Sequence, residues 1–554
     1  MTTHEVTPTV IPTPLDFPVV WADPSDVNLT LRRDKQHTPM PITPLTGWVH
    51  ENYWAKGISS GWWAMRVPRN MLVRRINTYS YLGSDPLAPP EGTPEAWALA
   101  DQCVTASIPT FGRRWDDEWL PEIKEYYSRW DAFDLPGATL DDLLVHLDWT
   151  LTAFVRLWHI HMELAPSRQA GPNRFHDLYM DLFGGETLDC FKLLQGIDNE
   201  SIAADMALWT LSRLVKSDHG LTSLFGETET GQVMDALSGT EAGIEFSIKF
   251  QAYLNMYGKR SDTVVELADP SWVEEPTTAI ELLKNYLSDS AVDPDIHWRE
   301  MTAEREKLVA EARENIAGYP DAVKGQFEML LAGGQQGHRI QEDHNWWLDQ
   351  QGLHRLRRVF LEVGKRFAAA GVIADSSDIW YLTIDEIRDD SGSGLSGDRR
   401  SQIEAEMARW AEIDAPPMVG TDYGPPPDNP VGHAIAKFYG DPPRPPTEDN
   451  PDVFGGTPGS PGKVRATARV IIKLADAGKL NEGEILVTAT TSPPWTPLFA
   501  TAGGIVTDTG GALSHCAIVA REYDIPAVVG TGVATSVPTT DRLWRSTAIP
   551  GKCG

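Results

Sequence analysis

A glycine-rich segment near the end of the chain combines one histidine with two hydroxyl side chains. Gly510 and Gly511 let the backbone turn tightly and approach a ligand closely. His515 follows at the predicted N-terminus of a helix, where free N–H groups and the helix dipole favour an anion. Thr509 and Ser514 can donate hydrogen bonds to phosphate oxygens. The pattern predicts that the imidazole of His515 is a nucleophile that becomes phosphorylated, the alternative being a helix-capping or core histidine.

The residues around His515 predict a small α/β domain over 463–554. Apolar and β-branched runs at 464–472, 484–488, 504–508 and 525–530 are typical of strands, and 514–522 suits a helix. This order of elements would place the glycine-rich segment between a strand end and a helix start.

The rest of the chain predicts a second, larger body. Apolar residues recur at spacings of three and four within 144–158 and within 353–367, which indicates amphipathic helices. We expect a mostly α-helical domain over 46–390, preceded by an extended arm over 1–45 whose prolines exclude a helix. Thirteen of the 41 prolines lie between Pro416 and Pro461, so 391–462 is predicted to be a semi-rigid linker. The predicted fold is therefore multidomain.

Several ordered motifs in the C-terminal part resemble one family. They are GEILV at 483–487, TSPPW at 491–495, the His515 segment, and IPAVVG at 525–530. This region, 462–532, resembles the phosphohistidine swivelling domain, the mobile domain of phosphoenolpyruvate (PEP)-utilising enzymes. That family includes phosphoenolpyruvate synthase, rifampicin phosphotransferase and phenylphosphate synthase. The tail 540–554 lacks the Gly/Asp/Val pattern of the family's closing strand.

A weaker resemblance covers parts of the helical region. Segments 257–276, 339–345 and 378–383 resemble the substrate-binding part of rifampicin phosphotransferase-like proteins, with Lys259 where the family often has His. The resemblance implies that this domain binds the molecule to which the phosphoryl group passes.

The segment 339–345 is the best candidate for this acceptor site. On a helix, Arg339, Glu342 and Asp343 are expected to share a face, with His344 beside it. Asp343 or His344 would take the proton of an acceptor hydroxyl, and Arg339 or Arg260 would bind the transferring phosphoryl group. An ordinary Arg339–Asp343 ion pair is the alternative.

The chain shows no GxxxxGK[ST] loop, and nothing in it resembles an ATP-grasp domain. The resemblance therefore implies that ATP and Mg²⁺ are bound by a separate ATP-grasp subunit, as in two-subunit phenylphosphate synthase. We expect a dikinase-type transfer to a small phenolic acceptor, with a rifamycin-type antibiotic or a non-catalytic phosphocarrier role as alternatives. No metal site is predicted, because His159 and His161 point apart on a helix.

The composition further narrows the classes of protein to which this chain can belong. The net charge of −30 disfavours binding to nucleic acid and to anionic membranes. The sequence has no apolar run of ~20 residues and no signal peptide pattern, so a membrane protein is not expected. Four scattered cysteines without a CxxC motif favour a cytoplasmic location. The 20 tryptophans indicate either a large aromatic core or a pocket for an aromatic ligand.

Overall fold

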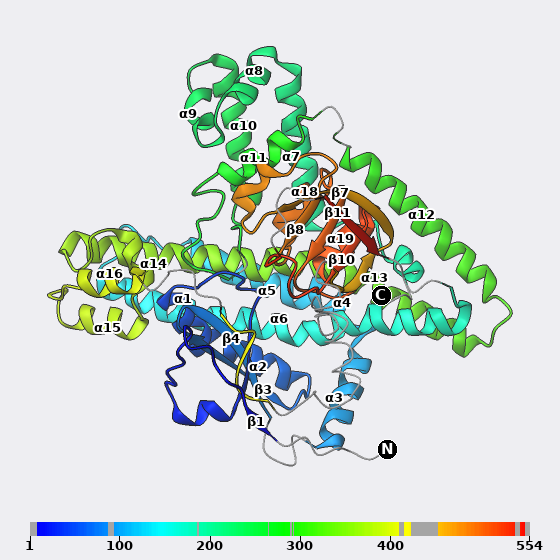
Figure 1. The fold of residues 1–554 in the computed structure, drawn as a ribbon, viewed down its shortest axis with the longest axis horizontal. Coiled ribbons are helices and arrows are strands. Elements are labelled where there is room, and N and C mark those ends of the chain that lie inside the picture. Colours follow the sequence, from blue (N-terminus) through cyan, green and yellow to red (C-terminus); the bar gives the residue numbers. More distant parts are fainter. Residues whose placement is uncertain are drawn as a thin grey trace.

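The computed structural model describes residues 8–86, 93–185, 188–263, 265–288, 291, 293–408, 415–422, 453–537 and 543–548. It confirms the multidomain fold class, with a large helical body and a C-terminal α/β domain (Figure 1). None of the described helices is both long enough and apolar enough to span a bilayer.

Two long helices run through the centre of the helical body. α6 (Leu140–Phe183) and α13 (Asp321–His344) pack antiparallel, and α14 (Gln351–Ala370) continues the direction of α13 after the π-helix η6 (Asn345–Gln350). The other helices around them are α1 (Pro44–Val49), α2 (Ala55–Ala64), α3 (Pro94–Ser107), α4 (Phe111–Arg114), α5 (Leu120–Asp131), α12 (Pro294–Asn315), α15 (Ile384–Gly392) and α16 (Arg400–Ala408). Most of the buried tryptophans lie inside this body, as an aromatic core requires.

Glycines let α6 and α13 approach closely. A Cβ atom on Gly337 would lie 2.5 Å from the carbonyl oxygen of Arg168 on α6, which is a steric clash. We therefore expect Gly337→Ala to lower the free energy of unfolding by about 1–3 kcal/mol, the usual cost of overpacking. Gly325, on the same helix, has open space around it. Gly325→Ala should instead raise stability by up to about 1 kcal/mol, the helix propensity gain. Chemical denaturation of both variants tests this difference, and equal effects would contradict it.

Two segments of the N-terminal arm are strands of a sheet. β1 (Thr9–Val10) and β2 (Thr30–Arg33) form a five-stranded sheet, order β1-β5-β2-β4-β3, with β3 (Arg69–Ile76), β4 (Tyr79–Pro86) and β5 (Met418–Asp422). β5 and α16 both belong to the segment predicted to be a linker. Val419 in β5 is fully buried, which explains why this part packs as a strand. Residues 457–460 of the predicted linker also form a strand, whereas 409–414 and 423–452 lie outside the described residues.

The C-terminal domain is built on a six-stranded sheet of order β11-β7-β8-β9-β10-β6. Its strands are β6 (Thr457–Ser460), β7 (Gly462–Val470), β8 (Ile485–Thr488), β9 (Gly504–Thr507), β10 (Ala527–Val529) and β11 (Leu543–Ala548). The central strands β7 to β10 are parallel, and β11 pairs antiparallel with β7 despite its unusual sequence. The helix α19 (His515–Glu522) follows β9, as predicted.

This domain is docked on the helical body (Figure 1). A shared hydrophobic cluster joins Leu474 and Phe499 of the domain to Leu283 of α11 (Thr277–Asn285), and it includes residues of α7 (Glu200–Ser217), α8 (His219–Glu227), α9 (Val233–Leu237) and α10 (Glu241–Tyr257). Polar contacts add to it: His338 Nε2 on α13 lies 2.9 Å from Glu522 Oε1. The Lys35 ammonium of the arm lies 3.7 Å from Asp508 Oδ2. The structure therefore shows the C-terminal domain in one defined docked position.

Candidate functional site

His515 occupies the first turn of α19 and faces the helical body. Gly510 adopts a positive φ of 109°, a conformation that favours glycine, in the turn between β9 and α19. The imidazole is 6% exposed, and its burial lowers the pKa of His515 to about 3. It is therefore neutral at physiological pH, the form in which a ring nitrogen has a lone pair for nucleophilic attack.

One ring nitrogen of His515 has a hydrogen-bond partner, and the other has none among the described residues. Thr491 Oγ1 lies 2.9 Å from Nδ1, whereas Nε2 is buried and has no hydrogen-bond partner among the described residues. The Phe499 ring stands perpendicular to the imidazole at 6.0 Å. Because Nδ1 is engaged, the geometry favours Nε2 as the atom that carries a phosphoryl group.

Thr491 contacts His515 but was not singled out in the sequence analysis, although it lies in the TSPPW run that resembles the family. We expect Thr491→Val to slow phosphorylation of His515 by up to about tenfold, because one neutral hydrogen bond is worth ~1 kcal/mol. Thr496→Val is the matched control, since the Thr496 hydroxyl donates to the carbonyl of Pro493 and not to His515. The rate of phosphate incorporation measures both, and an unchanged rate in Thr491→Val would show that this contact does not orient the ring.

Glu342 of α13 lies directly opposite His515. Its Oε2 atom is 3.8 Å from His515 Nε2 and accepts a hydrogen bond of 2.8 Å from the Ser201 hydroxyl on α7. The gap is longer than a hydrogen bond and too narrow for a phosphoryl group. The docked position therefore corresponds to the unphosphorylated histidine, and a phosphorylated His515 requires the two bodies to separate slightly.

Burial controls the charge of this carboxyl. The pKa of Glu342 is raised to about 8, mainly by desolvation; the nearby Glu522 and Asp343 carboxyls also raise this pKa, whereas Ser201 and Arg168 lower it. Both His515 and Glu342 are therefore driven to their neutral forms, so their contact is not an ion pair. A carboxyl with a pKa near neutrality can exchange a proton with a substrate hydroxyl.

The other predicted acceptor residues contact different neighbours, although Arg339 and Asp343 remain paired. The Asp343 carboxylate accepts a hydrogen bond of 3.0 Å from the Glu200 backbone N–H at the start of α7. Arg339 turns toward Asp116 of the π-helix η3 (Trp115–Trp119), at 3.0 Å, and lies 3.6 Å from Asp343. His344 faces α6. Consecutive helical residues point about 100° apart, so this segment divides its side chains among several neighbours. The ion pair considered as the alternative is present.

Two arginines of the helical body are buried. The predicted Arg260 is buried, with its guanidinium 4.7 Å from the Trp346 ring and its Nε donating to the Tyr257 carbonyl at 2.8 Å. Arg168 on α6 is 3% exposed and acts electrostatically on both Glu342 and His344. Arg168 was not predicted, and its only signal was a charged residue within an apolar helix face.

The hydroxyls predicted to bind phosphate are engaged elsewhere in this docked position. Thr509 Oγ1 donates to the Ala489 carbonyl at 3.1 Å, and Ser514 Oγ donates to the Gly511 carbonyl at 2.8 Å. Their role toward phosphate stays a prediction, because it requires these bonds to be exchanged. What the glycine-rich segment shows directly is the tight turn that starts α19 at His515.

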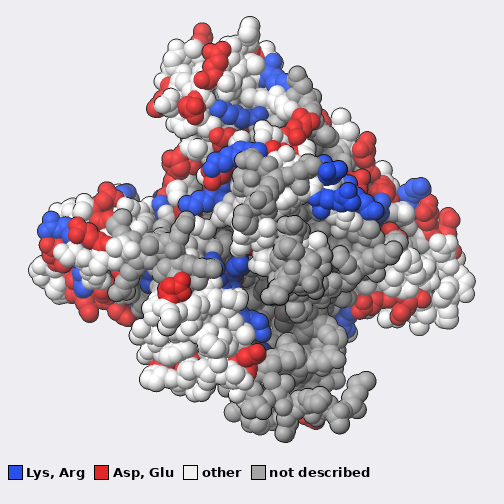
Figure 2. Space-filling model, viewed as in Figure 1, with Lys and Arg blue, Asp and Glu red and all other residues white. Residues whose placement is uncertain are grey.

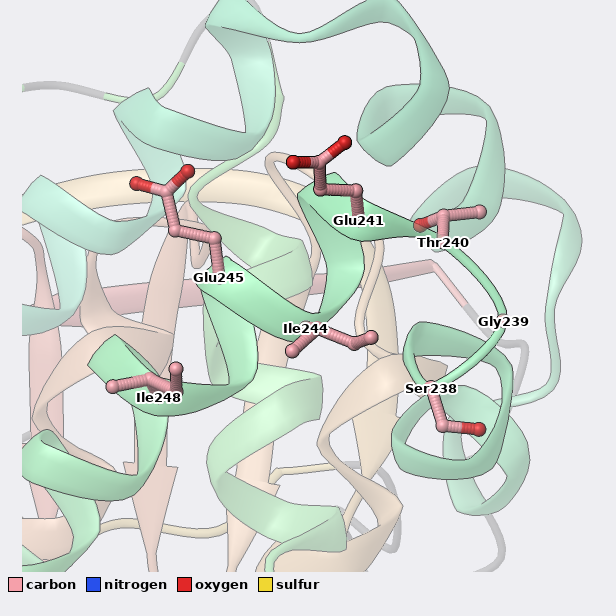
Figure 3. A pocket seen from close by; sticks show the side chains of 7 residues that line it. All are labelled: Ser238, Gly239, Thr240, Glu241, Ile244, Glu245 and Ile248. Atoms are coloured by element: carbon pink, nitrogen blue, oxygen red, sulfur yellow. The ribbon is translucent and has the colours of Figure 1, made fainter.

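A surface hollow in another part of the molecule has a different character (Figure 3). It measures about 490 Å³ and lies where α9 approaches α10; it is lined by Ser238, Gly239, Thr240, Glu241, Ile244, Glu245 and Ile248. Two carboxylates and no cation line it, so it is not suited to a phosphoryl group. Acidic and basic side chains are interspersed on the coloured surface of the molecule (Figure 2).

Two segments of the chain match known protein families. Residues 480–544 match the PEP-utilising enzyme mobile domain, and residues 170–333 match the rifampicin phosphotransferase fourth domain. Chondramide synthase cmdD of Chondromyces crocatus is 35% identical over 95% of this chain and 14% of that protein. The uncharacterized phosphotransferase YvkC of Bacillus subtilis is 30% identical over 66% of this chain and 43% of its own length. Rifampicin phosphotransferase of Streptomyces sviceus is 28% identical over 60% and 37%. The chain thus spans less than half of each of these relatives.

Proposed function

We propose that this chain transfers phosphoryl groups through His515. The premise is that it carries the mobile domain of PEP-utilising enzymes beside a region similar to the rifampicin phosphotransferase fourth domain. The observation that carries this proposal is the docked position of His515, whose Nε2 faces a buried carboxyl of the helical body. A swivelling histidine needs a second surface to which it delivers its group, and α13 offers one.

The proposed reaction has two steps. In the first, Nε2 of His515 attacks the β-phosphorus of ATP, so that a P–N bond forms, the α–β phosphoanhydride bond breaks and AMP leaves; water then cleaves the β–γ phosphoanhydride bond, releases phosphate and leaves one phosphoryl group on Nε2. In the second, an acceptor oxygen attacks the same phosphorus, the P–N bond breaks, and the imidazole is restored. The net reaction is that of a dikinase: ATP, water and acceptor give AMP, phosphate and phospho-acceptor.

Groups on the helical body are suited to the second step. Glu342 lies opposite Nε2 and has a pKa of about 8, so in its ionised form it can accept the acceptor's proton. The guanidinium of Arg168 acts electrostatically on the same carboxyl and would stabilise charge on the transferring group. This assigns to Glu342 the role for which Asp343 and His344 were first considered.

We propose further that ATP and Mg²⁺ are bound by an ATP-grasp protein outside these residues. No ATP-grasp sequence occurs in this chain, and its mobile domain would have to undock to reach one. A hydrophobic cluster and polar pairs such as His338–Glu522 hold the docked position, and undocking would break these contacts.

The acceptor is proposed to be a small phenolic hydroxyl compound. The similarity of residues 170–333 to a rifampicin phosphotransferase domain favours a larger antibiotic hydroxyl as the second candidate. With an ATP-grasp protein and ATP present, AMP formation that depends on added phenols supports the first, and dependence on rifampicin supports the second. If His515 is phosphorylated but no acceptor stimulates turnover, the chain is a phosphocarrier and the acceptor proposal fails.

A further inference from the structure

Three buried side chains converge where α6 passes the end of α13. His161 Nδ1 on α6 lies 2.9 Å from Asp349 Oδ1 in η6. The His344 ring, at the last position of α13, is nearly perpendicular to that of His161, with centroids 4.7 Å apart. One nitrogen or oxygen from each residue lies within 4.8 Å of those of the other two. Two imidazoles and one carboxylate are a ligand set that divalent transition metals prefer.

The π-helix η6 makes this convergence possible. His344 and Asp349 are five residues apart, and in a regular α-helix such residues point about 140° away from each other. In η6, which covers Asn345–Gln350, the wider π-helical turn brings them toward the same side. Turns of this kind are rare and occur often at functional sites. This cluster could not be predicted from the sequence, because His161 is distant from the other two residues along the chain.

The outer contacts of these side chains resemble those of metal ligands. His344 Nδ1 lies 2.8 Å from the Ile340 carbonyl, which can only accept a hydrogen bond, so Nδ1 carries the hydrogen and Nε2 has the lone pair. Asn345 Nδ2 donates to Asp349 Oδ2 at 3.1 Å and fixes the carboxylate. Contacts of this kind orient metal ligands and hold them in the required tautomer.

We propose that His161, His344 and Asp349 bind one Zn²⁺ ion. Zinc holds its ligands at roughly 2.0–2.3 Å, so neighbouring ligand atoms lie roughly 3–4 Å apart. The ion would replace the hydrogen shared by His161 and Asp349, whose atoms are 2.9 Å apart, and release that proton. His344 would close in through Nε2, and a water molecule or a substrate oxygen would take the fourth position. The Asp349 carboxylate offsets part of the charge of the ion. This inference does not depend on the proposed phosphotransfer.

Metal binding by the full chain tests the proposal directly. After dialysis against EDTA, calorimetric titration with ZnCl₂ should show one site per chain, and Co²⁺ should give the visible absorption of a four-coordinate site. His161→Gln and Asp349→Asn should each weaken Zn²⁺ binding at least about 100-fold, and the orienting contact removed by Asn345→Ala should cost about 10–100-fold. His219→Gln, at an exposed histidine of α8, is the control and should bind as the wild type does.

If a variant does not fold, X-ray absorption spectroscopy on the zinc-loaded wild type still identifies the ligands of the metal. Two imidazole nitrogens with further oxygen and no sulfur are expected. The proposal is overturned if the wild type binds no zinc, if sulfur ligands appear, or if folded His161→Gln and Asp349→Asn proteins bind zinc as tightly as the control. Circular dichroism of each variant establishes that it is folded.

Discussion

His515→Ala is expected to reduce acceptor-dependent AMP formation by at least about 10⁴-fold, the scale on which loss of a covalent nucleophile acts. The imidazole is the group on which both proposed steps depend, and no described neighbour can replace it: the adjacent Cys516 is buried, and burial raises the pKa of its thiol to about 12. The measurement is the steady-state rate with an ATP-grasp protein, ATP and a phenol.

The control for this variant is His219→Ala, which removes an exposed histidine on α8 and should leave the rate unchanged. The His515→Ala protein should remain folded, because the side chain contributes one hydrogen bond, to Thr491. A folded His515→Ala protein with more than a few per cent of the wild-type rate would mean that the phosphoryl group takes another route.

The second large effect is expected at Glu342. Glu342→Gln should slow transfer from phosphorylated His515 to the acceptor by about 10²- to 10⁴-fold, the usual contribution of a general base. Phosphorylation of His515 itself should continue, since that step takes place away from α13. Single-turnover measurements that start from the phosphorylated protein separate the two steps.

The raised pKa of Glu342 also predicts the direction in which the transfer rate changes with pH. A base works only when ionised, and burial raises the pKa of Glu342 to about 8. The wild-type transfer rate should therefore rise as the pH increases toward about 8 and level off above it, whereas Glu342→Gln should lack this step. Glu328→Gln, at a more exposed glutamate of the same helix that pairs with Arg313, is the control and should keep the rise. If the step persists in Glu342→Gln, another group is the base.

Local pattern was sufficient to predict much of the C-terminal domain. The runs around 485, 505 and 527 are strands, and α19 starts at His515, because short apolar segments separated by glycines leave few other solutions. In the helical body, the periodic segment 144–158 lies in α6. That helix continues through Pro166 and Pro172 to Phe183, however, because its packing against α13 outweighs the local cost of the prolines.

The candidate site could be predicted only in part, because its geometry depends on contacts between distant segments. Glu342 was among the predicted residues, but its place opposite His515 follows from the docking of two domains. Arg168 and Thr491 approach the site from other elements, and β5 joins a sheet formed mainly by the first 86 residues. Residue spacing along the chain reveals helical and strand periods, but it carries no information about contacts between distant segments.

The most direct test of the account is the location of the phosphoryl group. The chain is incubated with ATP, Mg²⁺ and an ATP-grasp protein, kept cold and alkaline, digested, and analysed by mass spectrometry and ³¹P NMR. We predict that the peptide containing His515 is about 80 Da heavier, one HPO₃, and that phosphorus is bonded to Nε2. An unmodified His515 in a mixture that consumes ATP, or phosphate on any other residue, would contradict the account.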